Sequence, residues 1–147
     1  MKFKVALALS AVALLSISAC KKAPSSDLPG AVNSARIITA NPDEWVSYGR
    51  TYDEQRFSPL DQINQDTVKD LGLAWSADLD TARGQEATPL AIDGKIYITT
   101  AWSKAKAYEA ATGKLLWEYD PKVPGERAVA ACCDVVNRGM AAWGDKL

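Results

Sequence analysis

The 147-residue sequence contains no histidine. Within this chain, that absence excludes Ser-His-Asp and Cys-His catalysis, as well as zinc or haem held by histidine. Acidic and basic side chains nearly balance, at 18 and 17, and leave a net charge of −1. Because nucleic-acid-binding proteins usually carry a basic surface, we expect no nucleic-acid partner. The length fits one domain and is too short for several.

Cysteine is scarce, with three in all, and the position of the first indicates export. Lys2 and Lys4 precede an apolar run over residues 5–17 that is too short to span a bilayer comfortably. The apolar run leads into the sequence I-S-A-C, whose last residue is Cys20. This sequence resembles a bacterial lipobox. We predict a signal peptide over residues 1–19 and a lipid anchor at Cys20, which would place the protein in the periplasm, attached to a membrane. A plain secretory signal with an incidental cysteine is the alternative.

Residues 20–40 are rich in proline, serine and glycine and lack apolar periodicity, which predicts a flexible tether. We expect the folded region to begin near residue 41 with a short helical turn. A second short helix is predicted over residues 64–72, with Asn64 as its N-cap and Gly72 as its C-terminal stop.

The rest of the chain has the pattern of short strands, so we predict an all-β fold. A loose alternation over residues 73–79 comes first, and Asp93-Gly94 is a strong hairpin signal. The four main predicted strands cover residues 87–92, 95–100, 104–109 and 114–119. Four antiparallel strands within about 35 residues match one blade of a β-propeller. Residues 139–147 predict the start of another hairpin, so the chain would cover about one to one and a half blades.

The turn before the last of these strands carries a more specific pattern. Residues 107–117 resemble the A-x-D-x-x-T-G-K-x-x-W repeat of quinoprotein dehydrogenases, with Glu109 at the Asp position. The resemblance implies that Trp117 packs between neighbouring blades. We expect Trp75 to belong to the blade core as well. Any hairpin with a T-G turn and a core tryptophan is the alternative interpretation of the pattern.

Cys132 and Cys133 are adjacent. Neighbouring α-carbons lie about 3.8 Å apart, whereas ordinary disulfides need roughly 4.4–6.8 Å. A bond between the two would therefore close a strained ring whose compact, rigid shape suits stacking on a flat cofactor. Two reduced cysteines that pack as small hydrophobic side chains are the alternative.

The surrounding residues carry a clear resemblance. Residues 132–139 match the C-C-D-x-V-N-R-G segment of PQQ-dependent alcohol dehydrogenases, and residues 84–89 resemble the G-Q-E-A-x-P segment of the same family. Weaker matches extend the resemblance over nearly everything after residue 41. Residues 99–104 and 121–126 look more like the quinohaemoprotein ethanol dehydrogenases than the methanol enzymes.

The resemblance implies a specific fold and a specific cofactor. The fold would be an eight-bladed propeller, of which residues 41–147 form the incomplete N-terminal part. Glu86 would hydrogen-bond PQQ, a disulfide between Cys132 and Cys133 would stack on one of its faces, and Arg138 would bind one of its carboxylates. The family also implies calcium or a lanthanide, a primary alcohol as substrate and a cytochrome c-type electron acceptor. A haem c in a further C-terminal domain is a feature of some members.

The resemblance also implies what this chain does not supply. The family's catalytic aspartate and its remaining metal ligands would lie beyond Leu147, so we expect neither a catalytic residue nor a metal site here, and no turnover by the chain alone. A non-enzymatic β-propeller lipoprotein that acts as a scaffold in outer-membrane protein assembly is the second interpretation. The adjacent cysteines and Arg138 argue against it, since a scaffold has no use for them.

Overall fold

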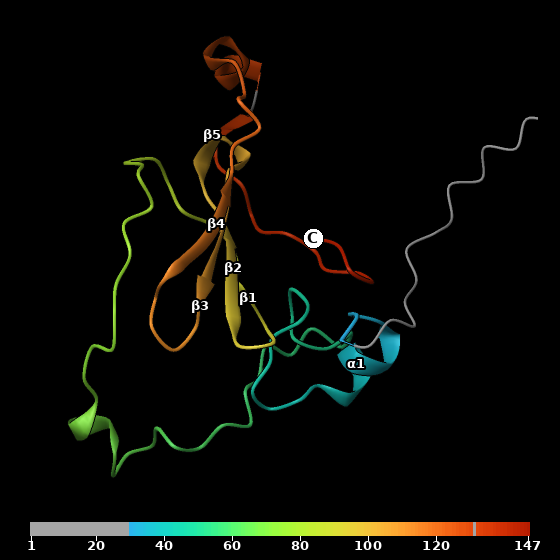
Figure 1. Cartoon of the computed structure of the whole chain (residues 1–147), viewed down its shortest axis with the longest axis vertical. Coiled ribbons are helices and arrows are strands. Elements are labelled where there is room, and N and C mark those ends of the chain that lie inside the picture. The colour runs from blue at the N-terminus through green and yellow to red at the C-terminus, as the bar shows by residue number, and fades with distance from the viewer. Residues whose placement is uncertain (1–29, 131) are drawn as a thin grey trace, which may run out of the picture.

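The computed structural model describes residues 30–130 and 132–147, except for the side chain of Cys132. Its centre is one antiparallel sheet with the strand order β1-β2-β3-β4 (Figure 1). The elements are α1 (Ser34–Thr39), η1 (Val68–Asp70), β1 (Leu90–Ile92), β2 (Lys95–Thr99), η2 (Ala101–Ser103), β3 (Ala105–Glu109), β4 (Leu115–Tyr119), η3 (Gly125–Ala130) and β5 (Cys132–Val135). No helix within the described ranges has the length and apolar character needed to cross a membrane.

The four predicted strands are confirmed, each somewhat shorter than its sequence pattern. β1 and β2 are joined at Asp93 and Gly94, which have φ angles of 49° and 69°. Both values lie in the left-handed region that a two-residue hairpin turn requires, and Asp and Gly tolerate that region best. The sheet is therefore one blade of the expected fold, and closure into an eight-bladed propeller stays a prediction.

The β3–β4 turn is stabilised by side-chain contacts as well as by backbone hydrogen bonds. Thr112 Oγ1 donates a hydrogen bond to Glu109 Oε2, so the longer acid at this repeat position still reaches the turn. Gly113 has a φ of 71°, and a Cβ atom there would lie 2.5 Å from the Trp75 ring. Trp75 thus packs directly on the turn, and it stacks on Tyr108 with ring centroids 6.2 Å apart.

The tether predicted over residues 20–40 is wrong for its C-terminal part. Asn33 caps α1 by accepting a hydrogen bond from the backbone N–H of Arg36, and Ile37 is buried. Arg36 also binds the carboxylates of Glu44 and Asp93, which fastens α1 to the β1–β2 turn. The folded region thus begins near residue 31, while residues 20–29 lie outside the described part of the chain.

The small hydrophobic core lies where the N-terminal segment meets the sheet. Trp45 pairs with Ala91 at the free edge of β1, and Val32 pairs with Gly144. These pairings bring together the buried side chains of Val32, Ile37, Val46, Leu90, Ile92 and Ala142. The N-terminal segment therefore fastens the blade to the residues that follow β5.

Three other predictions of local structure differ from the fold. The helix predicted over residues 64–72 is reduced to η1, although the Asn64 side chain does accept hydrogen bonds from the next turn. Residues 73–79 form no strand. Residues 139–143 contain only isolated bridges instead of the predicted continuous strand, although the antiparallel bridge between Trp143 and Lys146 forms the predicted turn between them. In each case, the local pattern has no continuous partner strand or helix within the described residues.

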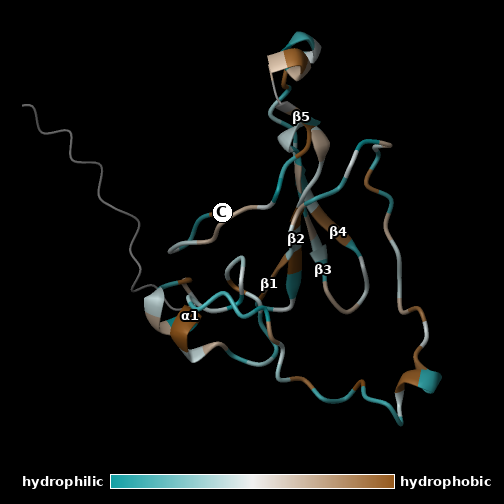
Figure 2. Ribbon diagram, turned by 180° about the vertical axis from the view of Figure 1, so that it is seen from behind, coloured by the Kyte–Doolittle hydropathy of each residue, from teal (hydrophilic) through white to brown (hydrophobic). Residues whose placement is uncertain are grey.

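β4 forms the outer edge of the blade, and all five of its residues are exposed. Figure 2 shows that this strand carries hydrophobic residues. They include Leu115, Leu116, Trp117 and Tyr119. The ring of Trp117 lies beside Tyr97 of the inner strand β2, with ring centroids 6.0 Å apart, and its predicted place between two blades stays a prediction.

Candidate functional site

Two segments far apart in the sequence run side by side near one end of the sheet. Residues 83–88 lead into β1, and residues 133–139 follow η3. Thr88 forms a parallel bridge with Gly139, and the Thr88 N–H donates to the carbonyl oxygen of Arg138 at 3.3 Å. The fold therefore brings together the two segments that the sequence marked as cofactor-binding.

Glu86 and Arg138 meet across these two segments. Arg138 Nε donates to Glu86 Oε2 at 3.1 Å. The hydrogen bond and the charge of Glu86 raise the pKa of Arg138 above its ordinary value, and Cys133, which this structure holds as a thiol, lies close enough to add to this effect. Three of the four predicted cofactor-binding residues therefore lie in one cluster. The Cys132 side chain lies outside the described part, so the disulfide stays a prediction.

The cluster is open to solvent. The Arg138 side chain is 70% exposed and that of Glu86 46%. An ion pair this exposed adds little to the stability of a fold. The guanidinium of Arg138 remains accessible to a ligand anion, with which it can form two parallel hydrogen bonds.

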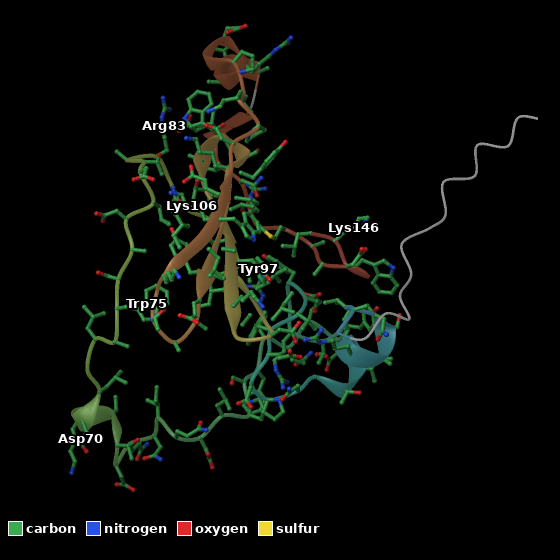
Figure 3. All side chains as sticks on the ribbon, viewed as in Figure 1. Asp70, Trp75, Arg83, Tyr97, Lys106 and Lys146 are labelled. Atoms are coloured by element: carbon green, nitrogen blue, oxygen red, sulfur yellow. The ribbon has the colours of Figure 1, made fainter. Side chains whose placement is uncertain are left out.

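A second ion pair joins the same two segments at β5, the strand that carries Asp134. Arg83 Nη1 lies 2.6 Å from Asp134 Oδ1. The Arg83 guanidinium also lies over the Trp102 ring, 5.7 Å from its centroid. Between the two ion pairs, Gly84 faces Val136: a Cβ atom added at Gly84 would lie 3.4 Å from Val136 Cγ1. Figure 3 labels Arg83 near β5, at the same end of the sheet.

Asn137 fixes the backbone on both sides of Arg138. Its Oδ1 accepts hydrogen bonds from Thr99 Oγ1 at 2.7 Å and from the Gly139 N–H at 3.0 Å. Its Nδ2 donates to Ser103 Oγ at 3.2 Å. Because Thr99 is buried at the end of β2, the segment that presents Arg138 is tied to the sheet.

Arg83, Asp134 and Asn137 were not among the sequence-predicted site residues. Each lies inside or next to a recognised motif: Arg83 directly precedes G-Q-E, and Asp134 and Asn137 belong to C-C-D-x-V-N-R-G. Their opposite charges are the one feature of the sequence that could indicate an ion pair between Arg83 and Asp134. Only the fold shows that the two residues meet.

These side chains fit PQQ, a planar quinone with three carboxylates. The accessible guanidinium of Arg138 suits a carboxylate, and Glu86 can accept a hydrogen bond beside it. The part of the chain that the structure describes contains no group of three or more Cys, Asp or Glu residues placed to hold a metal ion. Cys20 lies outside the described residues, so its lipidation stays a prediction.

Comparison with known proteins supplies the identity of the fold. Residues 45–147 match the PQQ domain family described as glucose/ethanol/alcohol dehydrogenase, beta-propeller domain. The chain belongs to this family. Membership in the PQQ alcohol dehydrogenase family confirms the resemblance that the motifs around Glu86 and Arg138 indicated.

Relatives of the PQQ alcohol dehydrogenase family match most of the chain. It is 60% identical over 127 residues to the dehydrogenase subunit of the quinone alcohol dehydrogenase of Komagataeibacter europaeus, covering 85% of this chain and 17% of the relative. It is 51% identical over 139 residues to a quinohemoprotein alcohol dehydrogenase of Pseudomonas putida, covering 93% of this chain and 19% of that protein. The chain thus spans less than a fifth of the length of these relatives.

Solved structures of the family agree with the blade. A quinohemoprotein alcohol dehydrogenase from Pseudomonas putida aligns with a TM-score of 0.76 and 53% identity over 80% of this chain and 18% of that one. The quinohemoprotein alcohol dehydrogenase from Comamonas testosteroni aligns with a TM-score of 0.73 and 45% identity, over 77% of this chain and 17% of that one. A europium-containing methanol dehydrogenase aligns with a TM-score of 0.66 and 34% identity, over 73% of this chain and 19% of that one. The greater similarity to the quinohemoproteins than to this methanol enzyme agrees with the sequence prediction.

Proposed function

We propose that this chain forms the N-terminal part of the propeller of a PQQ-dependent alcohol dehydrogenase, and that it provides one wall of the quinone site. The observation that carries the proposal is the meeting of Glu86 and Arg138 at 3.1 Å, beside Cys133. These residues come from two segments 52 positions apart. An exposed ion pair contributes little to folding, so its place beside Cys133 favours a role in binding.

Each side chain has a distinct task in this proposal. Arg138 binds a cofactor carboxylate through its guanidinium, and Glu86 holds the guanidinium in place while accepting a hydrogen bond from the ligand. Cys132 and Cys133, joined as a disulfide, present a flat surface to the ring. When bound, PQQ supplies the quinone that accepts two electrons and the associated hydrogen from the alcohol.

The remaining chemistry is assigned to residues outside this chain. In the intact enzyme, an aspartate would act as general base on the alcohol, and calcium or a lanthanide, when bound, would supply Lewis-acid chemistry. The substrate is a primary alcohol that leaves as the aldehyde, and a cytochrome c-type protein accepts the electrons. One relative is described as a 1-butanol dehydrogenase (cytochrome c), which supports this choice of substrate and acceptor. A haem c domain is part of the same proposal.

We place the enzyme in the periplasm, held to a membrane by lipid at Cys20. Lys2, Lys4, the apolar run over residues 5–17 and the lipobox-like I-S-A-C sequence support this placement. The matching family and the relatives above are dehydrogenases, which favours an enzyme over a scaffold lipoprotein.

Reconstitution tests the proposed activity. The full-length gene product is prepared without cofactor and assayed for reduction of an artificial dye with ethanol or 1-butanol, with and without PQQ and Ca²⁺. We expect dye reduction that requires both an alcohol and PQQ. Tight PQQ binding without alcohol oxidation would contradict the proposed reaction, and an absence of PQQ binding would contradict the proposed site.

A further inference from the structure

On the basis of the proposed quinone site, we infer that Arg83 and Asp134 are a positioning pair: they set how the Glu86 segment and the Arg138 segment lie against each other. Neither residue needs to touch the cofactor for this role. The pair lies at one end of the contact between the segments, and the Glu86–Arg138 pair lies further along it.

The register of the two segments supports this role. Arg83 and Asp134 are 51 positions apart, and Glu86 and Arg138 are 52 apart. The bridge between Thr88 and Gly139 is parallel, so the segments advance together from the first ion pair to the second. Fixing one pair therefore restricts where the other can form.

The order of charges favours the parallel arrangement that the backbone bridge forms. Along the first segment, the cation Arg83 precedes the anion Glu86, and along the second, the anion Asp134 precedes the cation Arg138. In parallel, each charge faces its opposite. If the segments ran antiparallel, Arg83 would face Arg138 and Glu86 would face Asp134, and like charges facing each other are unfavourable.

The place of Asp134 in the chain connects this register to the proposed stacking surface. Asp134 directly follows Cys133 and has a φ of 64°, in the left-handed region. The hydrogen bond from Arg83, followed by one from the Val135 N–H, lowers the pKa of the Asp134 carboxyl below its ordinary value. The carboxylate therefore stays charged at neutral pH. Arg83 thus holds the backbone that carries Cys133. Arg83 itself stands three positions before Glu86, the acid that holds Arg138.

Trp102 restricts the orientation of the Arg83 side chain. Its ring lies beneath the guanidinium, a geometry that favours a flat arginine over a lysine. Trp102 itself has a φ of 63° within η2, next to Ser103, which accepts a hydrogen bond from Asn137. The turn that supports Arg83 is thus bonded to the segment that carries Arg138.

A double-mutant cycle in the full-length gene product tests the inference. The variants are Arg83→Gln, Asp134→Asn and the combination of the two, and PQQ affinity is measured by fluorescence quenching of the cofactor-free protein. We expect each single substitution to weaken PQQ binding about fivefold, and the double substitution to weaken it no further. Arg83→Lys, which keeps the charge but not the flat group over Trp102, should recover part of the loss.

The matched control is Asp145→Asn with Lys146→Gln. This pair lies at 2.9 Å with side chains 50% and 64% exposed, comparable to Asp134 and Arg83 at 38% and 49%. PQQ affinity should be unchanged in the control. The melting temperature of the cofactor-free protein should be nearly the same in all variants, because both ion pairs are exposed.

The outcomes separate the inference from the proposed function. Wild-type PQQ affinity in all the Arg83 and Asp134 variants, or losses that add in the double variant, would overturn the positioning role alone. A loss of PQQ binding explained fully by a lower melting temperature would also overturn it. Failure of the wild-type protein to bind PQQ would overturn both.

Discussion

The indole of Trp75 donates a hydrogen bond from Nε1 to the carbonyl oxygen of Ala110 at 2.9 Å, across 35 positions of the sequence. This contact fastens the segment before the blade to the β3–β4 turn. Because Gly113 in the same turn leaves no space for a Cβ atom, the turn and the tryptophan depend on each other.

Gly113→Ala should therefore destabilise the fold more than Gly94→Ala. Both glycines have positive φ, 71° and 69°, which costs an alanine about 1–2 kcal/mol. Only at Gly113 would the methyl group meet the Trp75 ring, whereas nothing lies within 4 Å of that position at Gly94. Urea unfolding of the two variants, with tryptophan fluorescence, measures the difference. Equal loss of stability would show that the Trp75 contact is unimportant.

Lys106→Met should destabilise the blade by about 1–2 kcal/mol. The Lys106 side chain is only 3% exposed, and its ammonium lies 2.6 Å from Asp80 Oδ2 and 3.1 Å from Glu118 Oε2. Methionine keeps most of the apolar stem and removes the charge. Urea unfolding of the cofactor-free protein measures the loss, with Lys122→Met as an exposed control expected to change little.

The effect of Lys106→Met should depend on pH in a defined way. Burial alone would lower the pKa of Lys106, but hydrogen bonds to Asp80 and Glu118 outweigh it and raise the pKa above the ordinary 10.5. The hydrogen bond with Lys106 lowers the pKa of Asp80 below 3.8. The contribution of Lys106 is thus full below pH 10.5 and is lost as the pH rises through its raised pKa. That of Asp80 is full above pH 3.8 and is lost as the pH falls. A stability difference that varied between about pH 5 and 9 would contradict this assignment.

Replacing both adjacent cysteines should affect the cofactor more than the fold. A loop closed between neighbours removes almost no chain entropy, so a disulfide between Cys132 and Cys133 would contribute little stability. Cys132→Ala with Cys133→Ala, in the full-length gene product, should weaken PQQ retention and lower the melting temperature of the cofactor-free protein only slightly. If PQQ affinity and turnover are unchanged while that melting temperature falls sharply, the pair is a core element instead.

Cys20→Ser should release the protein from the membrane. The lipobox-like residues before Cys20 predict lipid attachment to its sulfur, and serine cannot take the thioether-linked lipid. Palmitate labelling in cells and fractionation into membrane and periplasm provide the measurement. Equal labelling of wild type and variant would show that Cys20 carries no lipid.

The blade was predictable because its signals are local. Asp93-Gly94 and Thr112-Gly113 mark turns through residues that tolerate positive φ, and the strands between them have β-branched and aromatic side chains. By contrast, α1 depends on Arg36, whose partner Asp93 is 57 positions away. Such a contact leaves no periodic pattern in a six-residue helix, so the sequence alone predicts a tether there.

The site was only partly predictable for a related reason. Glu86 and Arg138 were identified through the resemblance of their motifs, since nothing in their spacing indicates that they meet. The sequence does not predict the pairing of Arg83 and Asp134, because a single charge beside a motif usually lies on a solvated surface. Residues 73–79 show the opposite error: Leu73 belongs to an alternating pattern yet is 84% exposed and pairs with no strand in the described ranges.

PQQ affinity of the Arg138→Met variant tests the central claim most directly. The cofactor-free full-length gene product is titrated with PQQ by fluorescence quenching, beside Lys122→Met, which also removes one exposed positive charge. A charge-assisted hydrogen bond is worth about 1.5–3 kcal/mol, so Arg138→Met should weaken binding about tenfold to a hundredfold. Lys122→Met should bind as wild type. Equal PQQ affinity in wild type and Arg138→Met, both folded, would contradict the assignment of this cluster to the quinone site.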